Sequence, residues 1–426
     1  MHALLDTFRS RRLRTTGDVM LMEYLPASYH TTDNSHSQYF GALPSLLREM
    51  EHSIGYLHMH SDGPATRPTR AARNMLRHLN GVTATHELVS DYLTVGVWWR
   101  AMRTWQQLRR NAPTSAAIRA ALPPNSDLAQ LWLSWQPMYE QSVRGTHSVR
   151  TCLLSAMFDA AVKRQPPTTV WISAFEGQGW EACLARSVEH HKMKWLPYLH
   201  TMMRPWDLRA RSFLGEIKPE VLAVHGPHDK EELAPSGVSL IDVEALRYQH
   251  VGPTSNSEIR TRPATSLINR PWLVVGGAEC TQSNNELAEF LAAMSRQSVS
   301  RSVLVRWHPQ CGTPAMQLPN NVVLTTEPLA KLVKQVGGAL LVGTAAPLDT
   351  YLSGVPSCAF ATASGFAMSP IEENPFFHTA TTGDDAVNWL QTAENSAGFV
   401  PPVADYFIID SSLQRWGKLL RSLIAT

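Results

Sequence analysis

The chain has 426 residues, of which 44% are hydrophobic and 17% are charged. This length predicts two or three domains, and the low charge fraction with 13 Trp, 12 Phe and 10 Tyr excludes general intrinsic disorder. Thirty-eight basic residues against 36 acidic ones leave a formal net charge of +2, so no overall basic field points to nucleic acid as a partner.

The first half of the chain predicts a sheet with helices and a long insertion. Short apolar runs predict strands at 17–24, 54–58, 168–174 and 221–224. Helical spacing is found at 45–51, 179–191 and 244–248. The insertion covers about 61–165 and includes helical spacing at 83–110 and 147–164. The polar segment 251–270, rich in Pro, Ser, Thr and Asn, is the predicted linker between domains.

The second half alternates more regularly between strands and helices. Strands are predicted at 271–277, 301–307, 321–325, 338–343 and 355–360, with helices at 284–296, 329–336 and 347–353. Such β-α-β units form a parallel sheet covered on both faces. A last apolar and helical stretch, Tyr406 to Ile424, is expected to cross back onto the first domain.

We therefore predict an α/β protein with two doubly wound Rossmann-like domains. The first covers 1–262 and holds the helical insertion, the second covers 263–400, and 401–426 is the returning segment. Ligands bind in such proteins at the carboxyl ends of the strands. Glycosyltransferases of the two-Rossmann type (GT-B) have this shape, as do some sugar-nucleotide epimerases, and architecture alone does not choose between them.

Five cysteines bear on the compartment: Cys152, Cys183, Cys280, Cys311 and Cys358. Their odd number and wide spacing argue against a disulfide scaffold, and the lack of a C-x-x-C pair excludes a zinc ribbon. We expect a reducing, cytoplasmic environment. Residues 1–14 lack the apolar stretch of a signal peptide, and no segment approaches the ~20 apolar residues that span a bilayer.

Two polar positions end the second strand of the second domain. His308, followed by Pro309, is placed to donate to a phosphate oxygen, and Arg306 to neutralise its charge. An isolated His-Pro is more often a surface residue at a strand end, but the position at a carboxyl end favours a functional role.

Glycine-rich turns follow two other strands of that domain. Gly343-Thr344-Ala345 opens a helix that contains Asp349, and helix N-termini attract anions, although the turn is also consistent with a simple N-cap. Gly276 and Gly277 lie at the end of the first strand, where glycine lets a ligand approach the backbone. These residues form the predicted nucleotide and phosphate site.

In the first domain, the turn from Phe175 to Glu181 joins a strand to a helix. Glu176 or Glu181 would be the general base, with a pKa raised by desolvation beside Phe175 and Trp180. The alternative is an ordinary turn in which Glu181 favours the helix dipole.

Weaker candidates complete the site. Residues proposed to contact the acceptor or sugar are His36, Tyr39, Arg204 and His225. His58 with His60, and His190 with His191, lack a matching ligand cluster, so no metal is predicted. The segment 97–110, with three Trp and four Arg, is a candidate for peripheral contact with an anionic membrane, although a helix with inward aromatics is more common.

Four short stretches resemble bacterial surface-carbohydrate (O-antigen) biosynthesis proteins: Ser37 to Pro44, Phe175 to Glu181, Glu244 to Tyr248, and Asp410 to Trp416. More broadly, the chain resembles bacterial sialyltransferases and Kdo or nonulosonate transferases. The resemblance implies that Glu176 belongs to their acidic motif, His308-Pro309 to their His-Pro, and Thr344 to their Ser/Thr element. Phe175 replaces the first acidic residue of that motif, and Ala345 interrupts the Ser/Thr pair.

The resulting hypothesis is a metal-independent glycosyltransferase without a cofactor. It would move a sugar, with a CMP-activated acidic sugar as the specific expectation, to a glycan or lipid-linked glycan acceptor. The alternatives are a UDP-sugar transferase, a sugar-nucleotide epimerase, and a catalytically degenerate scaffold, which Phe175 and Ala345 favour.

Overall fold

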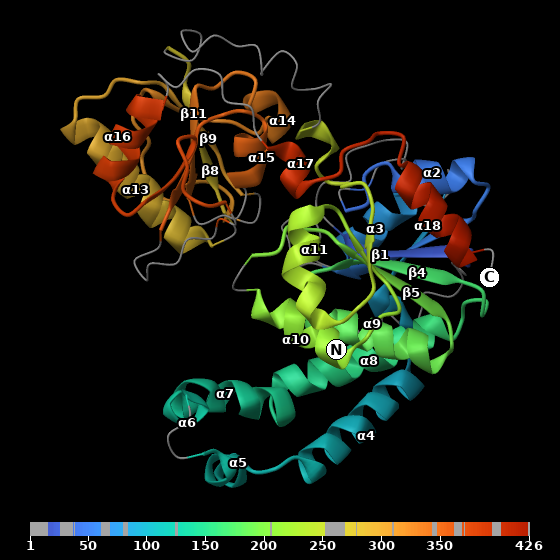
Figure 1. Ribbon diagram of the computed structural model, residues 1–426. Helices are drawn as coiled ribbons and strands as arrows, with labels where there is room; N and C mark the ends of the chain where they lie inside the picture. Colours follow the sequence, from blue (N-terminus) through green and yellow to red (C-terminus); the bar gives the residue numbers. More distant parts are fainter. Residues whose placement is uncertain are drawn as a thin grey trace.

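Two α/β domains, each built on one parallel sheet, make up the chain (Figure 1). The computed structural model describes residues 16–25, 37, 39–60, 69–79, 84–123, 127–204, 207–251, 269–277, 279–308, 311–342, 347–361, 369, 371–393 and 402–424.

The first domain has a seven-stranded sheet in the order β3-β2-β1-β4-β5-β6-β7. Its central strands β1 and β4 are buried along almost their whole length because helices cover both faces, and apart from Glu23 and Ser173 their side chains are apolar or aromatic. The strands are β1 (Val19–Leu25), β2 (Ile54–His60), β3 (Thr85–Leu88), β4 (Val170–Phe175), β5 (Lys194–Leu199), β6 (Leu222–Val224) and β7 (Leu240–Asp242).

Helices on the two faces of this sheet enclose the two largest hydrophobic clusters of the domain. One core packs the sheet against α8 and α9 around Trp171 and Phe158, and the other surrounds Tyr198 and Trp416. The helices of the domain are α2 (Leu43–Glu49), α3 (Thr69–Leu79), α8 (Thr146–Val162), α9 (Gly179–His190), α10 (Leu208–Glu216) and α11 (Pro227–Leu233), with short 3-10 turns η1 (Val89–Tyr92), η2 (Ala234–Ser236) and η3 (Gln249–Val251).

Four further helices form an arm that extends away from the first domain's sheet (Figure 1). They are α4 (Val95–Asn111), α5 (Ser115–Ala121), α6 (Asp127–Gln130) and α7 (Trp132–Val143). The arm returns to the domain through α8, on which α4 and α7 pack.

The second domain repeats the strand order of the first with six strands, β10-β9-β8-β11-β12-β13. The strands are β8 (Trp272–Gly276), β9 (Val303–Arg306), β10 (Val322–Leu324), β11 (Gly338–Val342), β12 (Ser357–Phe360) and β13 (Phe377–Ala380). The helices are α13 (Cys280–Arg296), α14 (Leu329–Leu332), α15 (Pro347–Leu352) and α16 (Gly383–Ala393), followed by α17 (Val403–Tyr406) and α18 (Gln414–Ile424).

This arrangement confirms the predicted pair of doubly wound domains, with corrections to single elements. Residues 244–248 are not helical; they form an irregular segment that ends in η3. The predicted helix at 83–110 begins only at Val95, because β3 and η1 precede it. Consequently the range 61–165 is not all insertion, since β3 is part of the main sheet.

The final helix, α18, lies against the first domain. Trp416 is fully buried in that domain's core, and its indole N–H donates to the carbonyl of Glu244 at 2.9 Å. The Glu244 carboxylate accepts the backbone N–H groups of Arg415 and Trp416 at 2.8 and 3.1 Å. Residues at the end of the chain thus complete a core that begins with β1.

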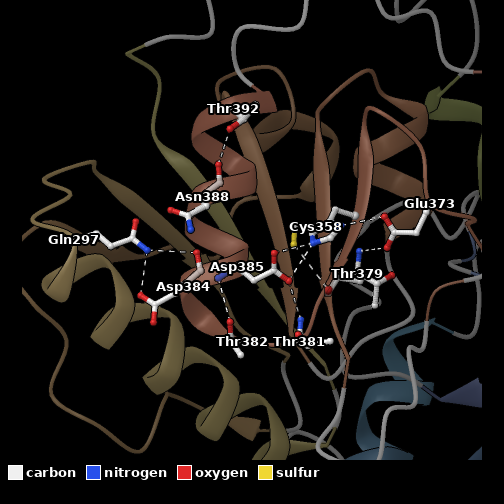
Figure 2. Close-up of polar contacts among 12 residues, drawn as sticks. Gln297, Cys358, Glu373, Thr379, Thr381, Thr382, Asp384, Asp385, Asn388 and Thr392 are labelled. Atoms are coloured by element: carbon white, nitrogen blue, oxygen red, sulfur yellow. Dashed lines mark hydrogen bonds and ion pairs between the residues drawn. The ribbon is translucent and has the colours of Figure 1, made fainter.

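At the far edge of the second domain, polar contacts fix β13 and α16 (Figure 2). Asp385 accepts the backbone N–H of Thr381 at 3.1 Å, and Glu373 accepts that of Thr379 at 2.5 Å. The His378 ring lies between these carboxylates, 3.0 Å from Glu373 and 3.1 Å from Asp385. Each acidic group has a structural partner, so this cluster holds an edge strand in place.

Within the part of the chain that the structure describes, no helix has the length and apolar character needed to cross a bilayer.

Candidate active site between the two sheets

In both sheets the strand order reverses at the centre, between β1 and β4 and between β8 and β11. The loops that leave the carboxyl ends of the two strands at such a switch point run to opposite faces of the sheet, which opens a crevice for ligands. In the first domain this crevice lies beside Tyr24 at the end of β1 and Glu176 after β4. In the second domain it lies beyond Gly276 and Val342.

Glu176 is half-buried at the first crevice, and Gln178 sets its orientation. The Gln178 side-chain amide donates to the Glu176 carboxylate at 2.6 Å. The side-chain carbonyl oxygen of Gln178 in turn accepts a hydrogen bond from the Tyr24 hydroxyl at 2.8 Å and one from the Trp180 indole N–H at 3.2 Å. The amide is therefore held from its far side, which suits a carboxylate that must face a substrate in a defined direction.

Glu181, the second candidate base, has a structural role in this geometry. Its side chain is fully buried, and its carboxylate accepts the backbone N–H groups of Glu176, Gly177 and Gln178 at 2.9, 3.0 and 3.1 Å. Burial raises the pKa of Glu181 to about 8, and these backbone hydrogen bonds act against the rise. We therefore assign Glu181 to shaping the turn that presents Glu176, because its oxygens face the backbone.

Tyr39 lies beside the same crevice, on a segment anchored from below. The Ser37 hydroxyl donates to Glu23 at 2.5 Å and accepts the Tyr39 backbone N–H at 3.1 Å. The Tyr39 ring lies 4.6 Å from that of His200. Burial, and then the charges of Glu176 and Glu23, raise the pKa of the Tyr39 hydroxyl, so it stays neutral and can donate a hydrogen bond.

Beneath Tyr39, Glu23 belongs to a buried polar group in the core. Nδ1 of His58 lies 3.5 Å from the Glu23 carboxylate, and Nε2 of His58 contacts Nδ1 of His86 at 2.9 Å. Burial raises the pKa of Glu23 to about 8. Burial also lowers the pKa of His58, and the neighbouring His86 lowers it further. The histidines are therefore neutral core residues.

Arg247, an exposed residue at the junction of the two domains, is not among the residues predicted from the sequence. Its guanidinium lies 5.4 Å from the ring of Tyr248. Interaction with Tyr248 raises the pKa of Arg247, and the charges of Asp349 and Glu176 raise it further. Desolvation acts in the opposite direction and lowers it. The signal was present in the stretch Glu244 to Tyr248, but an irregular segment after a strand has no pattern that marks one arginine.

The domains contact each other beside Arg247. Tyr248 and Val251 of the first domain share a hydrophobic cluster with Leu348 and Leu352 of α15. Because Asp349 lies on the same short helix, this packing brings its carboxylate toward Arg247, as their electrostatic interaction indicates. Charged groups from both domains therefore meet at this junction.

On the second domain, Arg306 continues this set of charges and His308 lies near it. Burial lowers the pKa of Arg306, and the charge of Asp349 opposes that shift. Burial lowers the pKa of half-buried His308, and the positive charge of Arg306 lowers it further. His308 is thus a neutral donor at pH 7, and charge coupling extends from Glu176 through Arg247 and Asp349 to Arg306.

Gly276, the last residue of β8, and Gly277 after it have a packing role that the sequence did not reveal. A Cβ atom at Gly276 would lie 2.5 Å from the Trp307 ring. Gly277 donates its N–H to the Val342 carbonyl at 2.9 Å and to the Ser283 hydroxyl at 3.1 Å. The indole of Trp307 fills the space beside Gly276, so close approach of a ligand is not what requires a glycine there.

A disulfide between Cys280 and Cys311 connects the first residue of α13 with the loop that follows β9. The cysteine count and spacing did not predict this pair. Cys152, Cys183 and Cys358 are buried and unpaired with one another. The disulfide restrains the loop that carries His308, because the Cys311 N–H also donates to the His308 carbonyl at 2.9 Å.

Two acceptor candidates are engaged elsewhere. His225 is fully buried, 2.7 Å from the Asp229 carboxylate, under the segment that contains Phe407. It therefore cannot contact an acceptor in this structure. Arg204 forms a bidentate pair with Asp207 at 2.9 and 2.8 Å, which matches the salt-bridge alternative. Five further candidates lie outside the described residues: His36, Pro309, Gly343, Thr344 and Ala345.

Among the described residues, one group has metal-ligand composition: Asp159, His190 and His191. The Asp159 carboxylate already contacts the guanidinium of Arg100 at 2.5 Å and His191 at 2.9 Å. A guanidinium at the same carboxylate opposes a cation, so we interpret the group as an ion-pair cluster.

No protein-family model matches the chain, and no curated protein matches it. Similar solved structures include α,α-trehalose 6-phosphate synthase from Burkholderia multivorans, at 11% identity over 96% of both chains with a TM-score of 0.45. Anabaena HepE, solved with UDP and glucose, is similar at 9% identity over 95% of this chain and 99% of its own, with a TM-score of 0.45. The spinosyn rhamnosyltransferase SpnG is similar at 11% identity over 96% and 100%, with a TM-score of 0.44. The fold assignment rests on the strand order of the two sheets.

Proposed function

We propose that the chain is a glycosyltransferase of the GT-B type that uses a nucleotide-activated sugar. The observation that carries the proposal is the placement of Glu176 at one switch point, near Arg247 of the same domain, with Arg306 on the second domain across the junction; Asp349 interacts with both arginines. A base opposite a positively charged anion site is what transfer from a sugar phosphate needs.

In the proposed reaction, Glu176 takes the proton from an acceptor hydroxyl. The hydroxyl oxygen bonds to the anomeric carbon of the donor, and the bond from that carbon to the phosphate oxygen breaks. His308 and Arg306 would stabilise the negative charge that develops on the leaving phosphate, with Arg247 as a further cation. Gln178 and Tyr24 keep the carboxylate aimed at the acceptor.

The donor that we propose is a CMP-linked acidic sugar, because its carboxylate would add a second anionic group for exposed Arg247. A UDP-sugar is the alternative donor. Thermal shifts with CMP, UDP and GDP would distinguish them, since a ligand that binds only the folded state raises its apparent stability.

Substitution tests the site directly. Glu176→Gln should reduce transfer ~10²–10⁴-fold while leaving nucleotide binding intact. His308→Ala should reduce it ~10²–10³-fold. Glu189→Gln is the matched control, because this carboxylate is exposed at the far end of α9. Full activity in both site variants would show that the site is wrongly assigned.

A second measurement separates the alternative functions. A transferase releases nucleotide only when an acceptor is present, whereas an epimerase changes its nucleotide-sugar without one. Nucleotide binding without turnover under any acceptor would favour the scaffold.

A further inference from the structure

The arm formed by α4 to α7 has a surface that the proposed chemistry does not use. From Tyr92 to Ser126 the sequence contains five arginines and neither an acidic residue nor a lysine. The arginines are Arg100, Arg103, Arg109, Arg110 and Arg119. This stretch thus carries a formal charge of +5, while the whole chain carries +2.

Helical spacing places several exposed side chains of α4 on one face. Val97 and Ala101 are buried against the domain. Val95, Trp99, Arg103 and Arg110 lie on the opposite side at intervals of four or seven residues, since successive residues turn by about 100°. Val95 is 64% exposed and Trp99 is 66% exposed.

The contacts of the arm show which of its arginines already interact with the protein itself and which are exposed to a partner. Arg100 contacts Asp159 at 2.5 Å, and the Arg109 guanidinium lies over the Trp105 ring at 4.9 Å. Arg103 and Arg110 are exposed on the outer face. They are therefore better probes of a partner than the two arginines that contact the protein itself.

The other long helix of the arm adds apolar surface. Leu133 is 77% exposed and Met138 is 69% exposed on α7, and Leu131, just before that helix, is 55% exposed. Trp98 on α4 is 40% exposed. Large apolar side chains this exposed in one projecting region mark a surface that another phase or molecule covers.

We infer that the arm docks on the surface of an anionic lipid bilayer. Arginines attract acidic headgroups, and tryptophan is favoured at the headgroup level, where its ring is both apolar and polar. Arginines alone would also suit a nucleic acid, but the aliphatic side chains of α7 have no role there. The inference does not rest on the proposed transfer activity.

Vesicle co-sedimentation of the whole protein tests the inference. Wild type should bind vesicles of phosphatidylcholine with phosphatidylglycerol, and should bind phosphatidylcholine alone at least tenfold more weakly. Raising the salt concentration should weaken binding to the anionic vesicles, because the Debye length falls.

Variants then assign the surface. Each exposed arginine near the membrane should contribute about fivefold, so Arg103→Ala with Arg110→Ala should weaken partitioning about 25-fold. Trp99→Ala should weaken it about fivefold or more, since binding follows the buried apolar area. Lys218→Ala is the charge control and Leu324→Ala the apolar control, because both side chains are exposed outside the arm. Thermal unfolding of each variant should match wild type.

Three results would overturn the inference. They are equal binding of wild type to anionic and neutral vesicles, unchanged binding of the arm variants, and binding to a DNA duplex in place of vesicles.

Discussion

The two domains share one strand order but are completed in different ways. The first domain is closed by α18, whose Trp416 enters the core from the other end of the chain. The second is closed locally, by the disulfide between Cys280 and Cys311, which are 31 residues apart, and by Trp307 against Gly276. The first domain therefore depends on long-range packing, and the second on short-range restraints.

The same contrast holds at the candidate site. On the first domain, side-chain hydrogen bonds orient Glu176, and a buried carboxyl group supports Tyr39. On the second, the disulfide and the tryptophan fix the backbone beneath His308. A proton acceptor needs a defined direction, whereas an anion site needs donors on a fixed backbone, so the difference fits the proposed division of roles.

The largest effect is expected from Trp416→Ala. Removing this buried ring should lower the free energy of unfolding of the first domain by about 3–5 kcal/mol. Hydrogen exchange reports each domain separately, so exchange should increase in β1 and β4 but not in β8. Lys418→Ala on the exposed side of α18 should change little. An equal increase of exchange in both domains would contradict the conclusion that Trp416 stabilises the first domain alone.

Reduction of the disulfide between Cys280 and Cys311 should destabilise the second domain. Closing a loop of this size contributes about 2–4 kcal/mol. Adding a reductant should therefore lower the unfolding temperature of the second domain, and the double variant Cys280→Ser with Cys311→Ser should no longer respond to it. A wild type insensitive to reductant would contradict this prediction.

Alternating strands and helices allowed the sequence to predict both domains, most reliably in the second. There, runs such as Gly338–Val342 are apolar throughout and are followed in the sequence by Gly343. The strands that were missed, β3, β5, β7 and β13, are short or carry polar residues, as in the sequence THEL of β3. Their strand conformation depends on the neighbouring strand, which local patterns do not contain.

The candidate site was predictable only where a polar residue directly follows a clear strand. Glu176 and His308 meet that condition. Arg247 does not, since its position depends on how α15 packs against an irregular segment. Glu181 was indistinguishable from Glu176 in sequence, because only the folded turn shows which carboxylate accepts the backbone N–H groups.

A matched pair of glycines tests the local closure of the second domain. Gly276→Ala would press a methyl group against the Trp307 ring and should cost about 1–3 kcal/mol. Gly179→Ala in the first turn of α9 meets no atom within 4 Å and should be neutral or slightly stabilising. Chemical denaturation measures both. Equal stability of the two variants would mean that Trp307 moves aside freely.

The smallest expected effect is a change in the stability of the first domain with pH, which arises from its buried carboxyl group Glu23. Burial raises the pKa of Glu23 from 4.5 to about 8, so folding takes up a proton between these values. Stability must then fall as pH rises through this window and level off above about pH 8, with a slope of at most ~1.4 kcal/mol per pH unit for this group. The lowered pKa values of His58 and His86 act in the opposite direction, but only below the ordinary histidine value of 6.5.

The free energy of unfolding should therefore be measured by denaturant unfolding between pH 6.5 and 8, where the histidines no longer contribute to its change with pH. Glu181 has a pKa raised in the same direction, so Glu23→Gln should reduce the slope without abolishing it. The amide introduced by this substitution can still accept the Ser37 hydroxyl, which keeps the Tyr39 segment in place. Glu49→Gln, on the exposed side of α2, is the control. The outcome that contradicts the prediction is an equal dependence of stability on pH in Glu23→Gln and wild type. It would mean that Glu23 is ionised in the folded protein, and that the segment carrying Tyr39 is not supported by a neutral buried acid.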